Sequence, residues 1–185
     1  MGELLLGRRL GRGRALSGPD GGGPLGRYAP EDDGGDLRQV RLLGLPLRLL
    51  LAAREHHDGL MREFRLLALA EDQPRAPVPA RLVELTEVLG RRYASARQRP
   101  DQEIDEALDR GEDVIDLSYE VPAGVAQGAA DLEALMAEAD TFCAAEQLMS
   151  LERPPVLQQF AHWYLEQFVV QVAGEPPTPW DGPRD

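Results

Sequence analysis

Residues 154–172 read PPVLQQFAHWYLEQFVVQV, and this stretch decides the fold class. Two prolines precede a run in which apolar side chains return every three or four residues. That spacing predicts a helix that is apolar around most of its surface, and such a helix has to be buried among other elements. We therefore expect residues 154–172 to form the central helix of a mainly helical protein.

Other segments of the chain carry the same helical period. Helices are predicted from Pro46 to just before Pro74, from about Pro79 to Arg97, from Pro100 to Gly111, and from about Ala123 to Met149. Gly111 is expected to end the third of these, because glycine accepts the left-handed conformation that closes many helices. Short connections between the helices favour an antiparallel bundle of four to five helices.

One segment breaks this pattern with a period of two. In residues 114–121, Ile115, Leu117, Tyr119 and Val121 alternate with polar side chains, and Pro122 follows. Alternation of this kind is typical of a strand with one buried face. A lone strand leaves backbone groups unpaired, so we expect it to pair with residues 38–45 as a small two-stranded β element.

The two ends of the chain have a different composition from its middle. Eleven of the 19 glycines lie in residues 1–35, so residues 1–37 are predicted to be a disordered leader, or the product of a misassigned translation start. Residues 38–173 form the predicted helical domain. Residues 174–185 are expected to be an extended proline-rich tail. Trp180 either docks on a partner or folds back, although a merely disordered tail is the most economical interpretation.

Residue types that are missing exclude several kinds of chemistry. All 20 basic residues are arginine, and the chain contains neither lysine nor asparagine. A P-loop lysine and a Schiff-base lysine are therefore excluded. The single cysteine, Cys143, rules out an internal disulfide and a multi-cysteine zinc site, and its place on an apolar stripe predicts a buried thiol. We expect no cofactor.

The net charge of −12 is unevenly distributed along the chain. Residues 38–100 carry +5 and residues 101–185 carry −16. Two such halves can neutralise each other inside one molecule or in a homodimer. The acidic surplus argues against a nucleic-acid partner, because phosphate contacts need a basic face. No signal peptide or membrane span is apparent, so a cytoplasmic, soluble protein is expected.

The densest polar cluster is Arg54, Glu55, His56, His57 and Asp58. Imidazole and carboxylate groups can bind a metal or act as acid and base, so a metal-assisted enzyme is one alternative. The spacing is poor for either role, because adjacent helical residues point about 100° apart. The structural interpretation, an Arg54–Asp58 pair beside one semi-buried histidine, is favoured. We therefore assign neither catalytic residues nor metal ligands.

Three aromatic residues are candidate interaction residues: Tyr119, Trp163 and Trp180. For Trp163 and its neighbour Tyr164, a place in the core is the more common role. His162 precedes Glu166 by four residues on the polar side of its helix, which predicts a solvated contact between them.

Several strings in the chain resemble a known family. They are Arg54-Glu-His-His-Asp58 with Met61-Arg-Glu-Phe64, Asp116-Leu-Ser-Tyr-Glu-Val-Pro122, Glu138-Ala-Asp-Thr-Phe-Cys143, and Trp163-Tyr-Leu-Glu-Gln-Phe168 with Gly174-Glu-Pro-Pro-Thr-Pro-Trp180. Over about residues 38–182, the chain resembles small proteins of GC-rich Gram-positive bacteria. That family is associated with anti-sigma-factor partner-switching systems and is often labelled ATP-binding or anti-sigma regulatory.

The resemblance implies a non-enzymatic regulator that binds a protein partner, such as an anti-sigma kinase or a STAS-type regulator. The alternative is a nucleotide-binding, kinase-like regulator, as the ATP-binding label suggests. Kinases of that type need an asparagine for magnesium and an Asp-x-Gly-x-Gly motif under the adenine. This chain has no asparagine, and its Asp32-Asp-Gly-Gly-Asp36 has the wrong order. A companion of such a kinase is therefore the favoured prediction.

Overall fold

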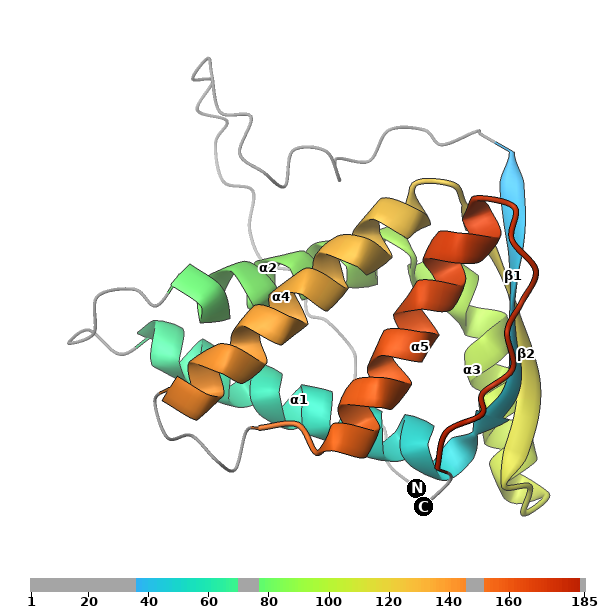
Figure 1. The fold of residues 1–185 in the computed structure, drawn as a ribbon, viewed down its shortest axis with the longest axis horizontal. Helices are drawn as coiled ribbons and strands as arrows, with labels where there is room; N and C mark the ends of the chain where they lie inside the picture. The colour runs from blue at the N-terminus through green and yellow to red at the C-terminus, as the bar shows by residue number, and fades with distance from the viewer. Residues whose placement is uncertain (1–35, 70–76, 146–151, 184–185) are drawn as a thin grey trace, which may run out of the picture.

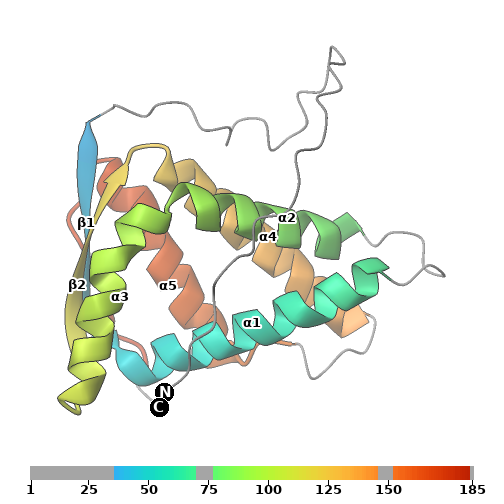
Figure 2. The same cartoon turned by 180° about the vertical axis from the view of Figure 1, so that it is seen from behind.

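The computed structural model describes residues 36–69, 77–145 and 152–183. These residues form five helices and two strands, so the prediction of a mainly helical fold with a small β element is confirmed. The elements are β1 (Leu37–Pro46), α1 (Leu47–Leu69), α2 (Pro77–Arg92), α3 (Ala94–Asp109), β2 (Val114–Pro122), α4 (Val125–Ala145) and α5 (Pro155–Val172). Figures 1 and 2 show the helices gathered on one side of the sheet.

The two strands pair as the alternation predicts. β1 and β2 run antiparallel, with Val40 opposite Tyr119 and Leu42 opposite Leu117, and all four side chains are buried. The register shifts between Leu42 and Leu45, where Gly44 adopts a φ of 67° that an L-residue rarely takes. The Gly44 N–H donates to the Asp116 carboxylate at 2.7 Å, so a β2 side chain fixes this bulge.

The core consists of two clusters of buried side chains. The first cluster lies between the sheet, α3 and α5 and includes Phe160 and Trp163. The second lies among α1, α2 and α4 and includes Phe64 and Cys143. Leu165 on α5 packs against both, so α5 has the central place that its apolar sequence predicts. The antiparallel bundle is found only in part, because α5 also packs against β1.

The boundary between α2 and α3 differs from the prediction. The chain turns at Tyr93, whose ring is 8% exposed, and α3 then continues through Pro100. The predicted helix start at Pro100 was therefore wrong. Proline in a helix interior removes one backbone hydrogen bond, and burial of the Pro100 ring among apolar groups offsets that cost.

The other helix ends agree better with the sequence. Gly111 ends α3 with a φ of 71°; its N–H donates to Leu108 O and that of Glu112 donates to Ala107 O, a Schellman motif. The predicted end of the fourth helix at Met149 lies outside the described residues, as does the leader up to residue 35. Among the helices that the structure describes, none combines the length and the apolar character that crossing a lipid bilayer requires.

The C-terminal tail is ordered against the rest of the molecule, so the prediction of a merely disordered tail was wrong. Figure 1 shows it running beside β1. The Trp180 backbone N–H donates to Leu43 O at 3.0 Å, and its side chain is 5% exposed. Thr178 is held by α5: its N–H donates to Gln167 Oε1 at 2.9 Å, and its carbonyl accepts from Trp163 Nε1 at 2.9 Å. Trp180 therefore folds back onto the core.

Candidate functional site

The predicted polar cluster on α1 does not converge on one point. Arg54 Nη2 donates to Asp101 Oδ1 of α3 at 2.7 Å, whereas Glu55 and Asp58 are exposed to solvent. The predicted Arg54–Asp58 pair is therefore replaced by a bridge to a residue 47 positions away. This bridge joins α1 to α3.

The two histidines of the cluster are both partly buried. Burial lowers the pKa of His57; the Asp58 carboxylate opposes this shift, whereas His56, Arg153 and Arg65 add to it. His57 is therefore neutral at pH 7. Among the residues that the structure describes, no three His, Cys, Asp or Glu side chains are grouped as metal ligands.

Close to the Arg54–Asp101 bridge lies a pair of tyrosines, of which Tyr119 is buried and Tyr164 partly buried. The hydroxyls of Tyr119 and Tyr164 are 2.8 Å apart, and burial raises the pKa of both, so both stay protonated. Tyr119 is only 4% exposed. It was predicted as an interaction residue, but its place between β2 and α5 is a core position.

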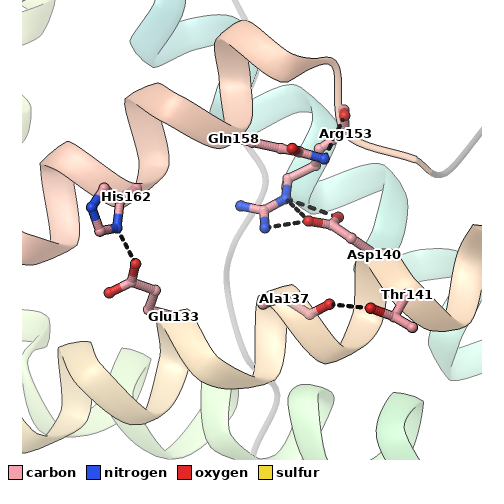
Figure 3. A network of polar contacts seen from close by, with 7 residues as sticks. All are labelled: Glu133, Ala137, Asp140, Thr141, Arg153, Gln158 and His162. Atoms are coloured by element: carbon pink, nitrogen blue, oxygen red, sulfur yellow. Dashed lines mark hydrogen bonds and ion pairs between the residues drawn. The ribbon is translucent and has the colours of Figure 1, made fainter.

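A second polar network joins α4 to the start of α5 (Figure 3). Arg153 donates from both Nε and Nη2 to the Asp140 carboxylate, at 3.0 and 2.6 Å. The side chains are 9% and 17% exposed, and Gln158 Nε2 donates to the Arg153 carbonyl at 3.0 Å. A two-pronged ion pair this well screened from water fixes the angle between the two helices.

His162 extends the same helix contact at the surface. Its Nδ1 pairs with Glu133 of α4 (Figure 3). Glu166, the predicted partner, lies 3.9 Å from Nε2. The hydrogen bond to Glu133 raises the pKa of His162. The predicted contact with Glu166 is therefore present, but it is secondary to a contact between helices.

The two tryptophans form one aromatic cluster with Phe160. The ring centroids of Trp163 and Trp180 are 5.5 Å apart, and that of Phe160 lies within 6 Å of both. Edge-to-face and tilted contacts at these distances are typical of packed cores. Both tryptophans, predicted as candidate interaction residues, are buried in this cluster. Cys143 is fully buried as predicted, and burial raises the pKa of its thiol.

Opposite charges of the two halves pair with each other at the surface of the molecule. Arg48, Arg54 and Arg81 from the basic half bridge to Asp113, Asp101 and Glu138 of the acidic half. This neutralisation is partial. Residues 101–120, which form most of α3 and β2, contain nine acidic residues and one arginine.

Within this acidic segment, three carboxylates stand out because they are exposed and, in the described part of the chain, form neither an ion pair nor a hydrogen bond. They are Asp105, Asp109 and Glu120. Residues 101–120 therefore carry a large excess of negative charge, and we call this segment the acidic face.

Sequence reasoning missed two groups of residues that hold the fold together. The first group is two glutamines of α5. Gln167, which is 1% exposed, accepts a hydrogen bond from the tail, and Gln171 donates one to β1. Their spacing of four residues inside an apolar helix was a usable signal. Arg153 and Asp140 lie 13 residues apart with no periodic relation, so no local signal predicts that pair.

Comparisons with known proteins add nothing to this description of the site. The chain matches no protein-family model, no curated protein and no solved structure.

Proposed function

We propose that this protein is a non-enzymatic regulator that acts by binding another protein through its acidic face. The observation that carries the proposal is the composition of residues 101–120, where α3, β2 and the connection between them hold nine acidic residues and one arginine. A surface of one sign of charge steers a partner of opposite charge and selects against others. The partner is then a protein with a basic patch.

The family resemblance supplies the biological setting of the proposal. It supports a place in an anti-sigma-factor partner-switching circuit, with an anti-sigma kinase or a STAS-type regulator as the partner. The side chains of Arg54, His57 and Tyr119 are engaged inside the protein, which fits a structural role for the polar cluster.

Affinity capture from the native host followed by calorimetry with the purified partner tests this proposal. We expect a complex whose dissociation constant rises steeply between about 50 and 300 mM salt, because exposed charges are screened over a Debye length of about 10 Å or less. A Glu84→Arg variant changes one exposed acid of α2 and serves as the control for net charge. Failure to recover any regulatory partner, together with a measured catalytic turnover, contradicts the proposal.

The competing prediction, a nucleotide-binding regulator, is separated by a thermal shift with magnesium and ATP. Ligand at about 100 times its dissociation constant stabilises a folded protein by roughly 2.7 kcal/mol. An unchanged melting temperature at millimolar ATP eliminates that alternative, whereas a shift of several degrees would replace our proposal by it.

A further inference from the structure

The two outer edges of the sheet are treated differently by the rest of the chain. On β1, the Arg41 N–H donates to Gln171 Oε1 at 2.9 Å, and the Arg41 carbonyl accepts from Gln171 Nε2 at 2.8 Å. Two residues further on, the Leu43 carbonyl accepts from the Trp180 backbone. A glutamine side chain and the tail therefore take the place of a third strand beside β1.

The outer edge of β2 carries no such cover. Because Arg41 directs its backbone groups away from β2, its partner Ser118 directs its own groups away from β1. Asp116 and Glu120 lie two residues before and after Ser118, so their backbone groups also point away from β1. Within the described ranges, the backbone N–H and carbonyl groups of these three residues form no hydrogen bond to the protein. An ordered strand thus presents a row of donors and acceptors to its surroundings.

The ends of this row define its length. Pro122, the last residue of β2, has no N–H to donate. At the other end the chain turns back into α3 at Gly111. The usable edge is residues 116–120, which suits an extended segment of about five residues.

Charge decides which occupant fits. A second copy pairing antiparallel through Ser118 would set Asp116 of one chain opposite Glu120 of the other, and like charges directly opposite each other destabilise a strand pair. A basic segment would instead place positive side chains opposite these carboxylates, and opposite charges stabilise a strand pair. The side chains of Asp116, Ser118 and Glu120 share the outer face of the sheet, where Asp116 also holds Gly44 and Glu120 is free of any ion pair with the described residues.

We propose that residues 116–120 of β2 dock an extended segment of a partner protein that carries arginine or lysine at alternate positions. This inference rests on the proposed function and specifies its binding mode, the addition of a strand to a sheet edge. Backbone hydrogen bonds supply the affinity, and the acidic face selects the basic side chains. Residues of the segment that hydrogen-bond to Ser118 place their side chains on the outer face, beside Glu120.

The probe is an eight-residue peptide of alternating arginine and valine, with binding to the full chain followed by fluorescence anisotropy. Two N-methylated forms separate strand addition from charge attraction. Methylation of the backbone nitrogens of the arginines removes the N–H groups that would pair with β2 when the arginine side chains lie on the outer face. We therefore expect binding to be lost. Methylation of the backbone nitrogens of the valines leaves the arginine N–H groups free to pair with β2. We therefore expect an affinity within about twofold of that of the parent peptide.

Variants of the chain provide the matching test. Ser118→Pro removes one outward N–H and leaves the ladder to β1 in place, and Glu120→Arg reverses the exposed charge. Each is expected to weaken the peptide by at least about tenfold, whereas Glu84→Arg, the same charge change on α2, is expected to alter it by less than about twofold. Circular dichroism verifies that the variants are folded; should Ser118→Pro not fold, Glu120→Arg still carries the test.

Several outcomes overturn the inference. Equal binding of the two methylated peptides, or equal loss from Glu84→Arg and Glu120→Arg, means charge attraction without strand pairing. A dimer of the wild type that Glu120→Arg alters makes a second copy the occupant. No binding of the parent peptide also refutes it. A captured partner that still binds Ser118→Pro and Glu120→Arg refutes the docking mode and leaves the proposed function standing.

Discussion

Replacement of Trp180 by alanine tests whether the tail is part of the folded structure. The Trp180 side chain is 5% exposed, packs against Phe160 and Trp163, and donates from Nε1 to the Pro183 carbonyl. The substitution removes the whole ring but keeps the backbone that bonds to Leu43. It therefore tests how far this ring, with its Nε1 hydrogen bond, anchors the tail.

The size of the effect follows from two opposing terms. Burying about 250 Å² of tryptophan at about 25 cal/mol per Å² contributes up to about 6 kcal/mol. Release of residues 179–181 returns about 1–2 kcal/mol of conformational freedom per residue. The expected loss of unfolding free energy is then about 2 kcal/mol, which lowers the melting temperature by about 4–8 °C in a chain of this size.

The assay is urea unfolding followed by circular dichroism and by tryptophan emission. The chain has two tryptophans, so in the variant all tryptophan emission comes from Trp163. We expect a lower urea midpoint and a red-shifted Trp163 emission, because the tail no longer covers that ring. Glu175→Ala, which changes an exposed side chain of the same tail, should leave both unchanged.

One result refutes this reasoning. If the Trp180→Ala variant unfolds at the wild-type midpoint and Trp163 keeps its emission maximum, the tail does not contribute to the stability of the folded protein.

Four further predictions concern single residues. Asp140→Asn leaves the Arg153 guanidinium buried without its counter-charge and should cost about 3 kcal/mol in urea unfolding. His57 has a lowered pKa, so the unfolded chain takes up a proton below its usual pKa of 6.5 that the folded chain refuses, and stability falls with acid; in His57→Gln the urea midpoint should fall less from pH 7 to pH 5. His162 has a raised pKa, so its contribution is present below pH 6.5 and disappears as pH rises through the folded pKa; His162→Gln should steepen the acid loss. Gly44→Ala should cost about 1–2 kcal/mol in thermal unfolding, because Gly44 has a φ of 67° and its Cβ would meet only the Trp180 carbonyl, 4.0 Å away.

The parts of the fold that the sequence predicted are those governed by local periodicity. The alternation through Leu117 and Tyr119 gave the strand and its buried face, because a strand shows one side to the core at every second residue. Gly111 marked a helix end because its backbone conformation excludes most other residues. In contrast, the prediction of a helix start at Pro100 is wrong, because the burial of Pro100 inside α3 depends on neighbours that the local sequence does not specify.

The candidate site was less predictable, because partners in space are not set by spacing along the chain. Arg54 has an acidic neighbour at i+4, yet the folded chain brings Asp101 closer. The tail illustrates the same limit. Its prolines predict an extended path but not the carbonyl of Leu43 or the amide of Gln167 that receive its N–H groups.

The two core clusters contain different side chains whose signals report on local unfolding. Both tryptophans and the three described tyrosines belong to or pack against the cluster beside the sheet, whereas the only cysteine lies in the cluster among α1, α2 and α4. Emission spectroscopy therefore observes one end of the protein, and the rate at which a thiol reagent modifies Cys143 observes the other. Measured together on the unmodified chain, the two signals distinguish an all-or-none unfolding transition from one in which the helical end separates first.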